Sequence, residues 1–468
     1  MHYHDIIIEA AGAKVERMPD KTRLGSFTVR VLASPAGEMT PEQATPVSYD
    51  DKALQAQVQA LESRALDDAA LRALGRTLAA LLLPPTPEGA LAGVRDLFAA
   101  SLVRLPPEDG LRVRLRLPPQ LAALPWEYLY VERAGGGDGM DGFVALDPRI
   151  ALVRHEALAA APVAPYAAGK LKIVVALASA PGFAQLDLSR EKADLEAAFA
   201  SQSAVEPVII EDATLDEVQA AITGAGVFHF AGHGKFDQQM GDTPGSFVGR
   251  GLLAFDDVLA DAEQVGINLR GAGVRLAVLG GCETGRRDGV NIWSGVAPAL
   301  VKAELPAVVA NQFTVRDDCA IAFSRHFYGA LVGGLPVEQA VAAGRIAAYN
   351  ADKTGRDWGA AVLYLRAANG VLFGGAADAG AKQQAAAAAR AVIDVRTGDV
   401  AAGGQVLGAN VGEIRQGALA VNVQVGAVSG SVTGATIGTM SGGSAEVKVE
   451  TGDVQEGGSV SGGTISLL

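Results

Sequence analysis

The chain has 468 residues, of which 49% are hydrophobic, and its formal net charge at pH 7 is −13. This length can bury one large core or two to three domains. Acidic and basic residues are interspersed, which excludes the basic stripe that nucleic-acid binding requires, so no nucleic-acid partner is expected. The two cysteines, Cys282 and Cys319, exclude a disulfide framework. Together with an N-terminus that lacks the features of a signal peptide, they predict a cytoplasmic protein.

Residues 1–110 are expected to form a lead-in region of strands followed by helices, packed on the domain that follows. Residues 27–31 alternate between apolar and polar side chains, which is typical of a half-buried strand. Leucines then recur at helical spacing from Asp51 to Leu83. Thr86-Pro87-Glu88 predicts the start of another helix, because a hydroxyl caps helix N-termini and proline is tolerated in the first turn.

The clearest strand of the sequence is Leu111–Leu117, in which arginine alternates with leucine and valine. Arg112, Arg114 and Arg116 fall on one face of it. An arginine row could bind an anion, but the favoured interpretation is a solvated face of a sheet.

From Lys170 onward, short apolar runs alternate with amphipathic segments, one of which opens with the capping box Thr214-Leu-Asp-Glu217. This alternation predicts an α/β fold with a mostly parallel sheet flanked by helices. In such sheets, functional groups gather at the carboxyl ends of the strands. The predicted strands are Leu171–Ala178, Pro207–Ile210, Val227–Phe230, Val274–Leu279, Ala307–Ala310 and Ala360–Leu365.

Two of these strands end in a small-residue turn that carries a reactive side chain, His233 after one strand and Cys282 after the other. A thiol becomes a nucleophile when a nearby base takes its proton, so these residues form a candidate catalytic dyad. Cys282 follows His233 by about 50 residues, the spacing that caspases show. The main-chain N–H groups of Gly234 and Cys282 are the candidate oxyanion donors.

The other histidine and cysteine of this region are expected to be structural. His229 lies inside a strand, where it packs or hydrogen-bonds, and Cys319 lies in a predicted helix over Asp317–Leu331 as a small core residue. A zinc site made of His229, His233 and Cys282 is disfavoured, because no fourth ligand stands at metal spacing. The sequence therefore predicts no metal and no cofactor.

The composition changes after Phe373, since no aromatic residue, proline, histidine or cysteine occurs from Gly374 onward. We divide this part into an alanine-rich linker over residues 374–395 and a Gly/Val/Ser/Thr-rich tail over residues 396–468. A repetitive β-structure, solenoid-like or strand-adding, is the favoured interpretation of the tail. Disorder and a glycine-faced membrane helix are the alternatives, and the polar and β-branched content disfavours the helix.

Several motifs of the chain resemble the CHAT family of caspase-like cysteine peptidases, in the group that contains caspases, gingipains and separase. The motifs are Leu124-Pro-Trp-Glu127, Ile150–Arg154, His229-Phe-Ala-Gly-His-Gly234, Gly281-Cys-Glu-Thr-Gly285, Leu305–Asn311, Phe327-Tyr328 and Trp358–Leu365. The resemblance implies a caspase-type peptidase domain over residues 111–373. Helical repeats that many relatives carry are not evident here, so it does not identify an activator.

The resemblance also suggests where a substrate binds. Asp317 resembles the position at which separase-like relatives place an acid in the pocket for the residue before the cut, which implies a preference for a basic residue at that position (P1). Its rival is Arg190, which resembles the arginine that caspases use to bind aspartate. Phe313 stands where many relatives carry tryptophan and is expected to line the site.

Two functions follow as alternatives. The first is a caspase-like endopeptidase that performs limited proteolysis of a protein substrate, in the bacterial signalling or defence context that the resemblance implies. The second is a catalytically idle scaffold that acts through its tail. An activator or a second copy of the chain is expected to bind through residues 396–468, by pairing with unpaired strand edges. No membrane partner is expected.

Overall fold

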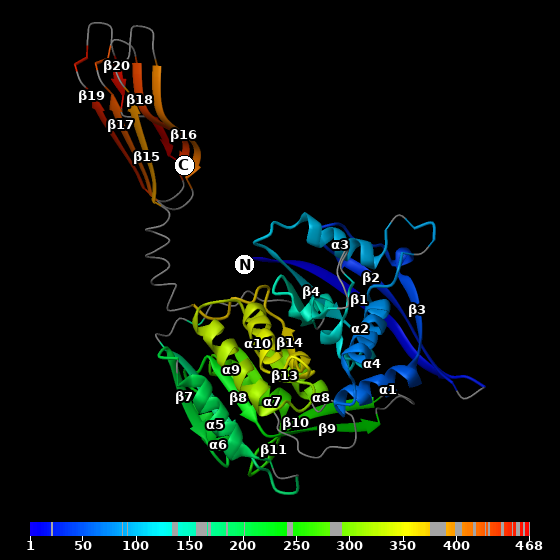
Figure 1. The fold of residues 1–468 in the computed structure, drawn as a ribbon. Coiled ribbons are helices and arrows are strands. Elements are labelled where there is room, and N and C mark those ends of the chain that lie inside the picture. The colour runs from blue at the N-terminus through cyan, green and yellow to red at the C-terminus, as the bar shows by residue number, and fades with distance from the viewer. Residues whose placement is uncertain are drawn as a thin grey trace. The chain divides into compact units, whose positions relative to one another are not determined.

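The computed structural model divides the chain into two compact units, residues 1–375 and 376–468, which we describe separately (Figure 1). The structure describes all residues except 20–21, 87, 91, 133–138, 156–165, 167–169, 184–185, 201, 241–246, 281–292, 375–389, 398–404, 415–417, 426, 429–430, 441–443, 452, 455–458, 462–463 and 468. The first unit contains the predicted strand–helix alternation, and the second contains the repetitive tail.

An eleven-stranded sheet forms the centre of the first unit. Its neighbouring strands are parallel except β1–β2, β2–β3 and β13–β14. In spatial order the strands are β3 (Thr45–Asp50), β2 (Arg23–Ala33), β1 (Tyr3–Arg17), β4 (Gly110–Arg116), β5 (Ile150–Arg154), β14 (Ala361–Leu365), β13 (Ala307–Asn311), β12 (Leu276–Gly280), β8 (Val227–Ala231), β6 (Leu171–Leu177) and β7 (Val205–Ile210).

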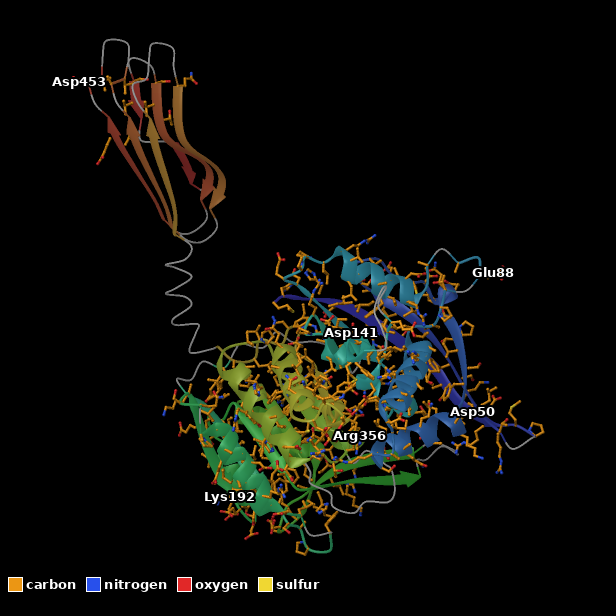
Figure 2. The ribbon with its side chains drawn as sticks, viewed as in Figure 1. Asp50, Glu88, Asp141, Lys192, Arg356 and Asp453 are labelled. Atoms are coloured by element: carbon orange, nitrogen blue, oxygen red, sulfur yellow. The ribbon has the colours of Figure 1, made fainter. Side chains whose placement is uncertain are left out.

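Helices cover this sheet and bury its apolar residues. Between β5 and β7, one core includes residues of α6, α7 and α8, and a second includes residues of α5, α9 and α10, while a third joins α1, α2 and α3 to the N-terminal strands. Side chains fill the space between these layers (Figure 2). The helices are α1 (Asp51–Glu62), α2 (Asp68–Leu82), α3 (Val94–Arg104), α4 (Pro119–Ala122), α5 (Leu188–Phe199), α6 (Leu215–Ala221), α7 (Ala262–Gly271), α8 (Trp293–Lys302), α9 (Asp317–Val332) and α10 (Val337–Ala351). Short 3-10 turns are η1 (Pro41–Gln43), η2 (Trp126–Tyr128), η3 (Met140–Gly142), η4 (Val144–Leu146) and η5 (Asp357–Gly359).

The predicted α/β class is confirmed, and each strand predicted between residues 171 and 365 is present within a few residues of its expected bounds. The alternation of strands with helices explains this success, because strands buried on both faces are continuous apolar runs. A small three-stranded sheet was not predicted. It consists of β9 (His233–Met240), β10 (Phe247–Ala254) and β11 (Leu259–Asp261), and it follows β8 directly.

The helices predicted over Asp51–Leu83 are confirmed, whereas the helix start predicted at Thr86 was wrong. The helical spacing from Asp51 to Leu83 contains two helices, α1 and α2, because Asp67 caps the second one by accepting a hydrogen bond from the Ala70 N–H. The next helix, α3, begins at Val94 and not at Thr86. The Thr86 hydroxyl instead donates to the carboxylate of Asp96, which lies in the first turn of α3. Pro87 lies outside the described residues.

The solvated arginine face predicted for β4 was also wrong, because Arg112 and Arg114 are only 4% exposed. Arg112 pairs with Asp5 and with Glu338 of α10. Arg114 pairs with Asp5 and donates to the carbonyls of residues 365, 367 and 368. A buried guanidinium is tolerated when carboxylates and carbonyls satisfy it, and these acceptors come from distant parts of the chain.

The second unit is a two-sheet parallel β-solenoid, which agrees with the favoured interpretation of the tail. One sheet contains β15 (Arg390–Thr397), β17 (Ala418–Val425) and β19 (Ser444–Thr451) in that order. The other contains β16 (Gln405–Ile414), β18 (Ser431–Met440), β20 (Ser459–Ser461) and β21 (Thr464–Leu467), the last two both paired with β18. The chain alternates between the sheets and completes a rung in about 27 residues, within the range of solenoid repeats. Most of the linker predicted over 374–395 lies outside the described residues.

Among the described residues, no helix is both long enough and apolar enough to cross a membrane.

The buried Arg112–Glu338 pair joins β4 to α10 and generates the first testable prediction. Replacing Glu338 with alanine leaves Arg112 with less compensation for its buried charge, so Glu338→Ala should lower the free energy of unfolding by about 3–5 kcal/mol. Glu132→Ala is the control, because Glu132 is 71% exposed in its pair with Arg76, and it should cost less than about 1 kcal/mol. Urea unfolding measures both, and equal losses in the two variants would contradict the buried-pair assignment.

Candidate active site

The two proposed catalytic residues follow neighbouring strands of the central sheet. β8 and β12 are parallel partners, and their register pairs Ala231 with Gly280. His233 stands two residues beyond Ala231, and Cys282 stands two residues beyond Gly280. Cys282 lies outside the described residues, so the structure gives no distance between the thiol and the imidazole. The prediction that these strands are neighbours is confirmed, and the dyad itself stays a prediction.

The structure gives His233 an enclosed position at the start of β9. Its side chain is buried, at 3% exposure, and its ring stacks on the ring of Phe183 with 5.0 Å between centroids. The preceding Gly232 packs against Phe230, since a Cβ there would lie 2.7 Å from the Phe230 ring. Gly234, the predicted oxyanion donor, lies within β9 beside Leu253, and not in a turn.

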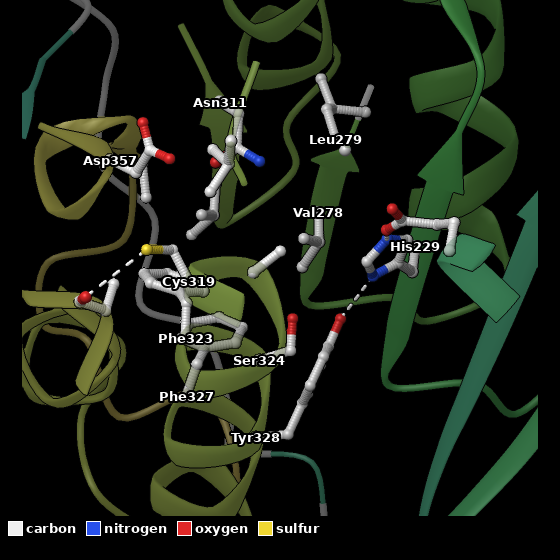
Figure 3. A pocket seen from close by; sticks show the side chains of 17 residues that line it. His229, Val278, Leu279, Asn311, Cys319, Phe323, Ser324, Phe327, Tyr328 and Asp357 are labelled. Atoms are coloured by element: carbon white, nitrogen blue, oxygen red, sulfur yellow. Dashed lines mark hydrogen bonds and ion pairs between the residues drawn. The ribbon is translucent and has the colours of Figure 1, made fainter. Parts of the chain in front are cut away.

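His229, inside β8, is held by two polar neighbours. Its Nδ1 lies 2.7 Å from the hydroxyl of Tyr328 on α9, and its Nε2 lies 3.7 Å from Oε1 of Glu191 on α5 (Figure 3). Either group can donate in the hydrogen bond between Nδ1 and the hydroxyl, depending on the tautomer of the ring. Burial raises the pKa of Tyr328, so its hydroxyl stays protonated. His229 thus hydrogen-bonds to α9 and lies close to Glu191, in line with the packing or hydrogen-bonding role expected for it.

Glu191 and His229 lie beside Gly280, the last residue of β12. A Cβ built on Gly280 would lie 3.3 Å from Nε2 of His229 and 3.5 Å from Oε1 of Glu191. A side chain at this position would therefore be in close contact with both polar atoms. A carboxylate thus lies next to the backbone two residues before the proposed nucleophile.

A pocket opens at this place, between the carboxyl ends of β12 and β13 and the face of α9 (Figure 3). Its wall is mainly apolar, with a few polar groups, which is the composition typical of ligand sites. The polar groups that line it include Glu191, His229, Asn311, Ser324 and Asp357. The apolar wall includes Val278, Val309, Val315, Phe323, Phe327 and Ala361.

Carboxylates gather around the first turns of α5, beside this pocket. Asp194 has its pKa raised to about 6, first by burial and then by the negative charges of Glu191 and Asp317, while Arg190 opposes the rise. The raised pKa reflects burial together with the negative charges of the neighbouring carboxylates, which Arg190 offsets only in part. Such an environment favours the arrival of a further cation.

The two rival specificity residues contact each other. Arg190 forms an ion pair with Asp317, and their side chains are 56% and 34% exposed. Asp317 lies in the first turn of α9 but does not cap it through its side chain. Phe313 does not line the pocket beside His229. It lines a separate small pocket with Leu61 and Pro125, and the guanidinium of Arg356 lies 4.0 Å from its ring centre.

Cys319 forms part of the pocket wall but has the properties of an inert thiol. It is 1% exposed, and its Sγ lies 3.6 Å from the Ala348 carbonyl oxygen (Figure 3). Burial, followed by the nearby charges of Asp357, Asp318 and Asp352, raises its pKa to about 12. Because the thiolate is the nucleophile, this cysteine remains unreactive near neutral pH.

Within the described parts of the chain, no group of three or more histidine, cysteine, aspartate or glutamate residues is arranged to hold a metal ion. Sequence reasoning missed the roles of Glu191 and Tyr328. The motif Phe327-Tyr328 marked the second, but nothing in the sequence indicated that its hydroxyl reaches His229 across 99 positions.

The first unit is an α/β protein in which the neighbouring parallel strands β8 and β12 end at Ala231 and Gly280. Residues 72–366, which are more than half of the chain, match the model of the CHAT domain. The chain therefore belongs to the CHAT family, and the resemblance seen in its motifs is confirmed.

The chain is also similar in structure to two crystal structures of the Saccharomyces cerevisiae separase–securin complex, solved at 3.0 and 2.6 Å resolution. Their TM-scores are 0.40 and 0.39, each at 10% identity, covering 77% of this chain and 30% of the matched chain. This chain thus spans less than a third of the length of the proteins that it matches. Comparison with curated proteins gives no match.

The contrast between the two cysteines gives a second prediction. At pH 8, iodoacetamide should leave Cys319 unmodified in the folded protein and modify it after denaturation, because burial and neighbouring carboxylates keep the thiol protonated. Mass spectrometry of the tryptic peptides locates the label. Cys319→Ala should not change labelling of the folded chain, and rapid native labelling at Cys319 would contradict its assignment to the core.

Proposed function

We propose that this chain is a cysteine endopeptidase that uses His233 and Cys282 to cut a protein substrate at a limited number of positions. The observation that carries the proposal is the register of β8 and β12, since these parallel neighbours end side by side at Ala231 and Gly280, each two residues before a proposed catalytic residue. Membership in the CHAT family supports it.

In the proposed reaction, His233 takes the proton of the Cys282 thiol, and the thiolate attacks the substrate carbonyl carbon. The main-chain N–H groups of Gly234 and Cys282 stabilise the oxyanion that forms. The imidazolium then donates its proton to the leaving amine, and water hydrolyses the acyl-enzyme. Phe183, stacked on the imidazole, restricts the orientation of the base.

A catalytically idle scaffold that acts through its tail is the alternative. Retention of both a histidine and a cysteine just beyond these strand ends favours the enzyme, because a scaffold has no need of the pair. The tail would serve either function by binding an activator or a second copy of the chain through residues 396–468, and it would supply no catalytic group.

The dyad gives the third prediction. Cys282→Ala should abolish peptide hydrolysis, and His233→Ala should lower kcat/KM by on the order of 10³-fold or more, because thiol activation and leaving-group protonation both depend on the imidazole. His326→Ala is the matched control, because it removes an exposed histidine of α9. A fluorogenic peptide library measures the rates. Hydrolysis at the wild-type rate by Cys282→Ala would exclude the proposal, and absence of hydrolysis and of thiol-probe labelling in the wild type would favour the scaffold.

We further propose that the residue before the cut is basic. Glu191 lines the pocket next to Gly280, and the carboxylates around α5 outnumber their guanidinium. A substrate guanidinium entering this pocket would be stabilised by charge-assisted hydrogen bonds. Arg190 is paired with Asp317, so both the acid and the arginine suggested by the sequence are engaged before a substrate binds.

The fourth prediction tests this preference. Wild-type enzyme should cleave after arginine or lysine, and Glu191→Gln should raise KM for such peptides by about tenfold with little change for apolar ones, because one charge-assisted contact is lost. Glu196→Gln, an exposed position of the same helix, is the control.

Arg190→Ala separates the rival assignments. It should improve cleavage after arginine by releasing Asp317, whereas loss of cleavage after aspartate would identify Arg190 as the specificity residue. Strong wild-type cleavage after aspartate, with none after arginine or lysine, would reverse the proposed preference.

A further inference from the structure

The solenoid of the second unit has unpaired strand edges at both ends of the part that the structure describes. Among the described residues, β15 pairs only with β17 and β16 only with β18, so these two strands form the first rung with one edge open. β19, β20 and β21 form the last rung in the same way. Open strand edges present rows of N–H and C=O groups that pair with another strand.

The last rung also exposes apolar residues that the middle rung buries. Val428 and Val432 of the middle rung are 0% and 1% exposed. Their register partners one rung further on, Val454 and Val460, are 51% and 41% exposed. The next rung of the solenoid therefore covers these positions wherever one is present. Solenoid ends that remain single in solution usually carry a polar cap instead.

The residue types on the two edges of the β15–β17–β19 sheet are complementary in charge. The central strand has the uncharged Asn422 and Gln424. At the same register positions β15 carries Asp394 and Arg396, and β19 carries Lys448 and Glu450. Each of these two register positions thus has one sign of charge on the first rung and the opposite sign on the last, whereas the positions of Arg390 with Ser444 and of Val392 with Glu446 do not pair opposite charges.

From these observations we propose that the last rung of one copy of this chain binds the first rung of a second copy, parallel and in register. The in-register continuation places Asp394 of one copy beside Lys448 of the other, and Arg396 beside Glu450. In the second sheet, Val406, Val432 and Val460 share one register position. The continuation therefore places Val406 of one copy next to the exposed Val460 of the other.

A second copy fits these ends better than an unrelated strand does. Its strand β15 has the same length as β19 and opposite charges at two register positions, and opposite charges directly opposite one another stabilise a strand pair. The contact is head-to-tail, so it does not close and can be repeated along a row of chains. It would raise the local concentration of the attached first units.

This inference deepens the proposed docking role of residues 396–468 by naming the partner. Its test reads association in the absence of any substrate, so it can fail or succeed independently of peptidase activity.

The experiment exchanges charges at one end of the solenoid without changing net charge. One variant is Lys448→Asp with Glu450→Lys, and the other is Asp394→Lys with Arg396→Glu. Sedimentation velocity of the full chain over a range of concentrations should show association of the wild type. Each exchange alone should weaken it at least about tenfold, because two attractive contacts become repulsive. An equimolar mixture of the two variants should regain association, since each then meets a complementary end.

A matched control makes the same exchange elsewhere. Lys14→Glu with Glu16→Lys swaps an exposed ion pair on strand β1 and should leave association unchanged. Circular dichroism confirms that each variant retains its β-structure. A wild type that stays monomeric at every concentration, exchanges that leave association intact, or a mixture no more associated than its components would each overturn the proposal.

Discussion

The first unit depends on a carboxylate buried where three parts of the chain meet. Glu127 in η2 is 1% exposed, and it accepts hydrogen bonds from Arg154 at the end of β5 and from Gln312 just after β13. An unpaired carboxylate in this position would cost several kcal/mol, so the three segments must come together for the domain to fold. Gln312 also donates to the Gly359 carbonyl of η5, and Arg154 donates to the Leu124 carbonyl.

This network explains why motifs that are far apart in the sequence belong to one pattern. Leu124-Pro-Trp-Glu127, the strand that ends in Arg154 and the segment that contains Trp358 all meet at the Glu127 carboxylate or at the residues bonded to it. Its effect reaches the candidate site, because Gln312 fixes the carboxyl end of β13, and the neighbouring Asn311 lines the pocket beside His229. The polar contacts of the core thereby set the position of one wall of that pocket.

The sequence permits prediction of elements whose environment is local and fails where partners are distant. β6, β8, β12 and β13 were predictable because burial on both faces produces continuous apolar runs, and the places of His233 and Cys282 at neighbouring strand ends followed from parallel topology. The burial of Arg112 did not follow, since alternation with apolar residues is the same for a solvated face and for one whose charges are neutralised by Asp5 and Glu338. The ion pair of Arg190 with Asp317 was equally hidden, because each residue alone suggested a substrate contact. The geometry of Cys282 itself lies outside the described residues.

The carboxylates around α5 repel one another, and this repulsion bears on which substrate residue the proposed pocket would bind. The folded-state pKa of Asp194 is raised to about 6, above its ordinary value, so ionising this group costs stability as pH rises through that value. Near neutral pH, the folded protein therefore holds negative charges that repel one another, with Arg190 as a partial counterion. A bound cation would relieve this repulsion, whereas a bound aspartate would increase it. The same repulsion would favour a basic substrate residue over an acidic one in the proposed site, and Arg190 offsets it in part.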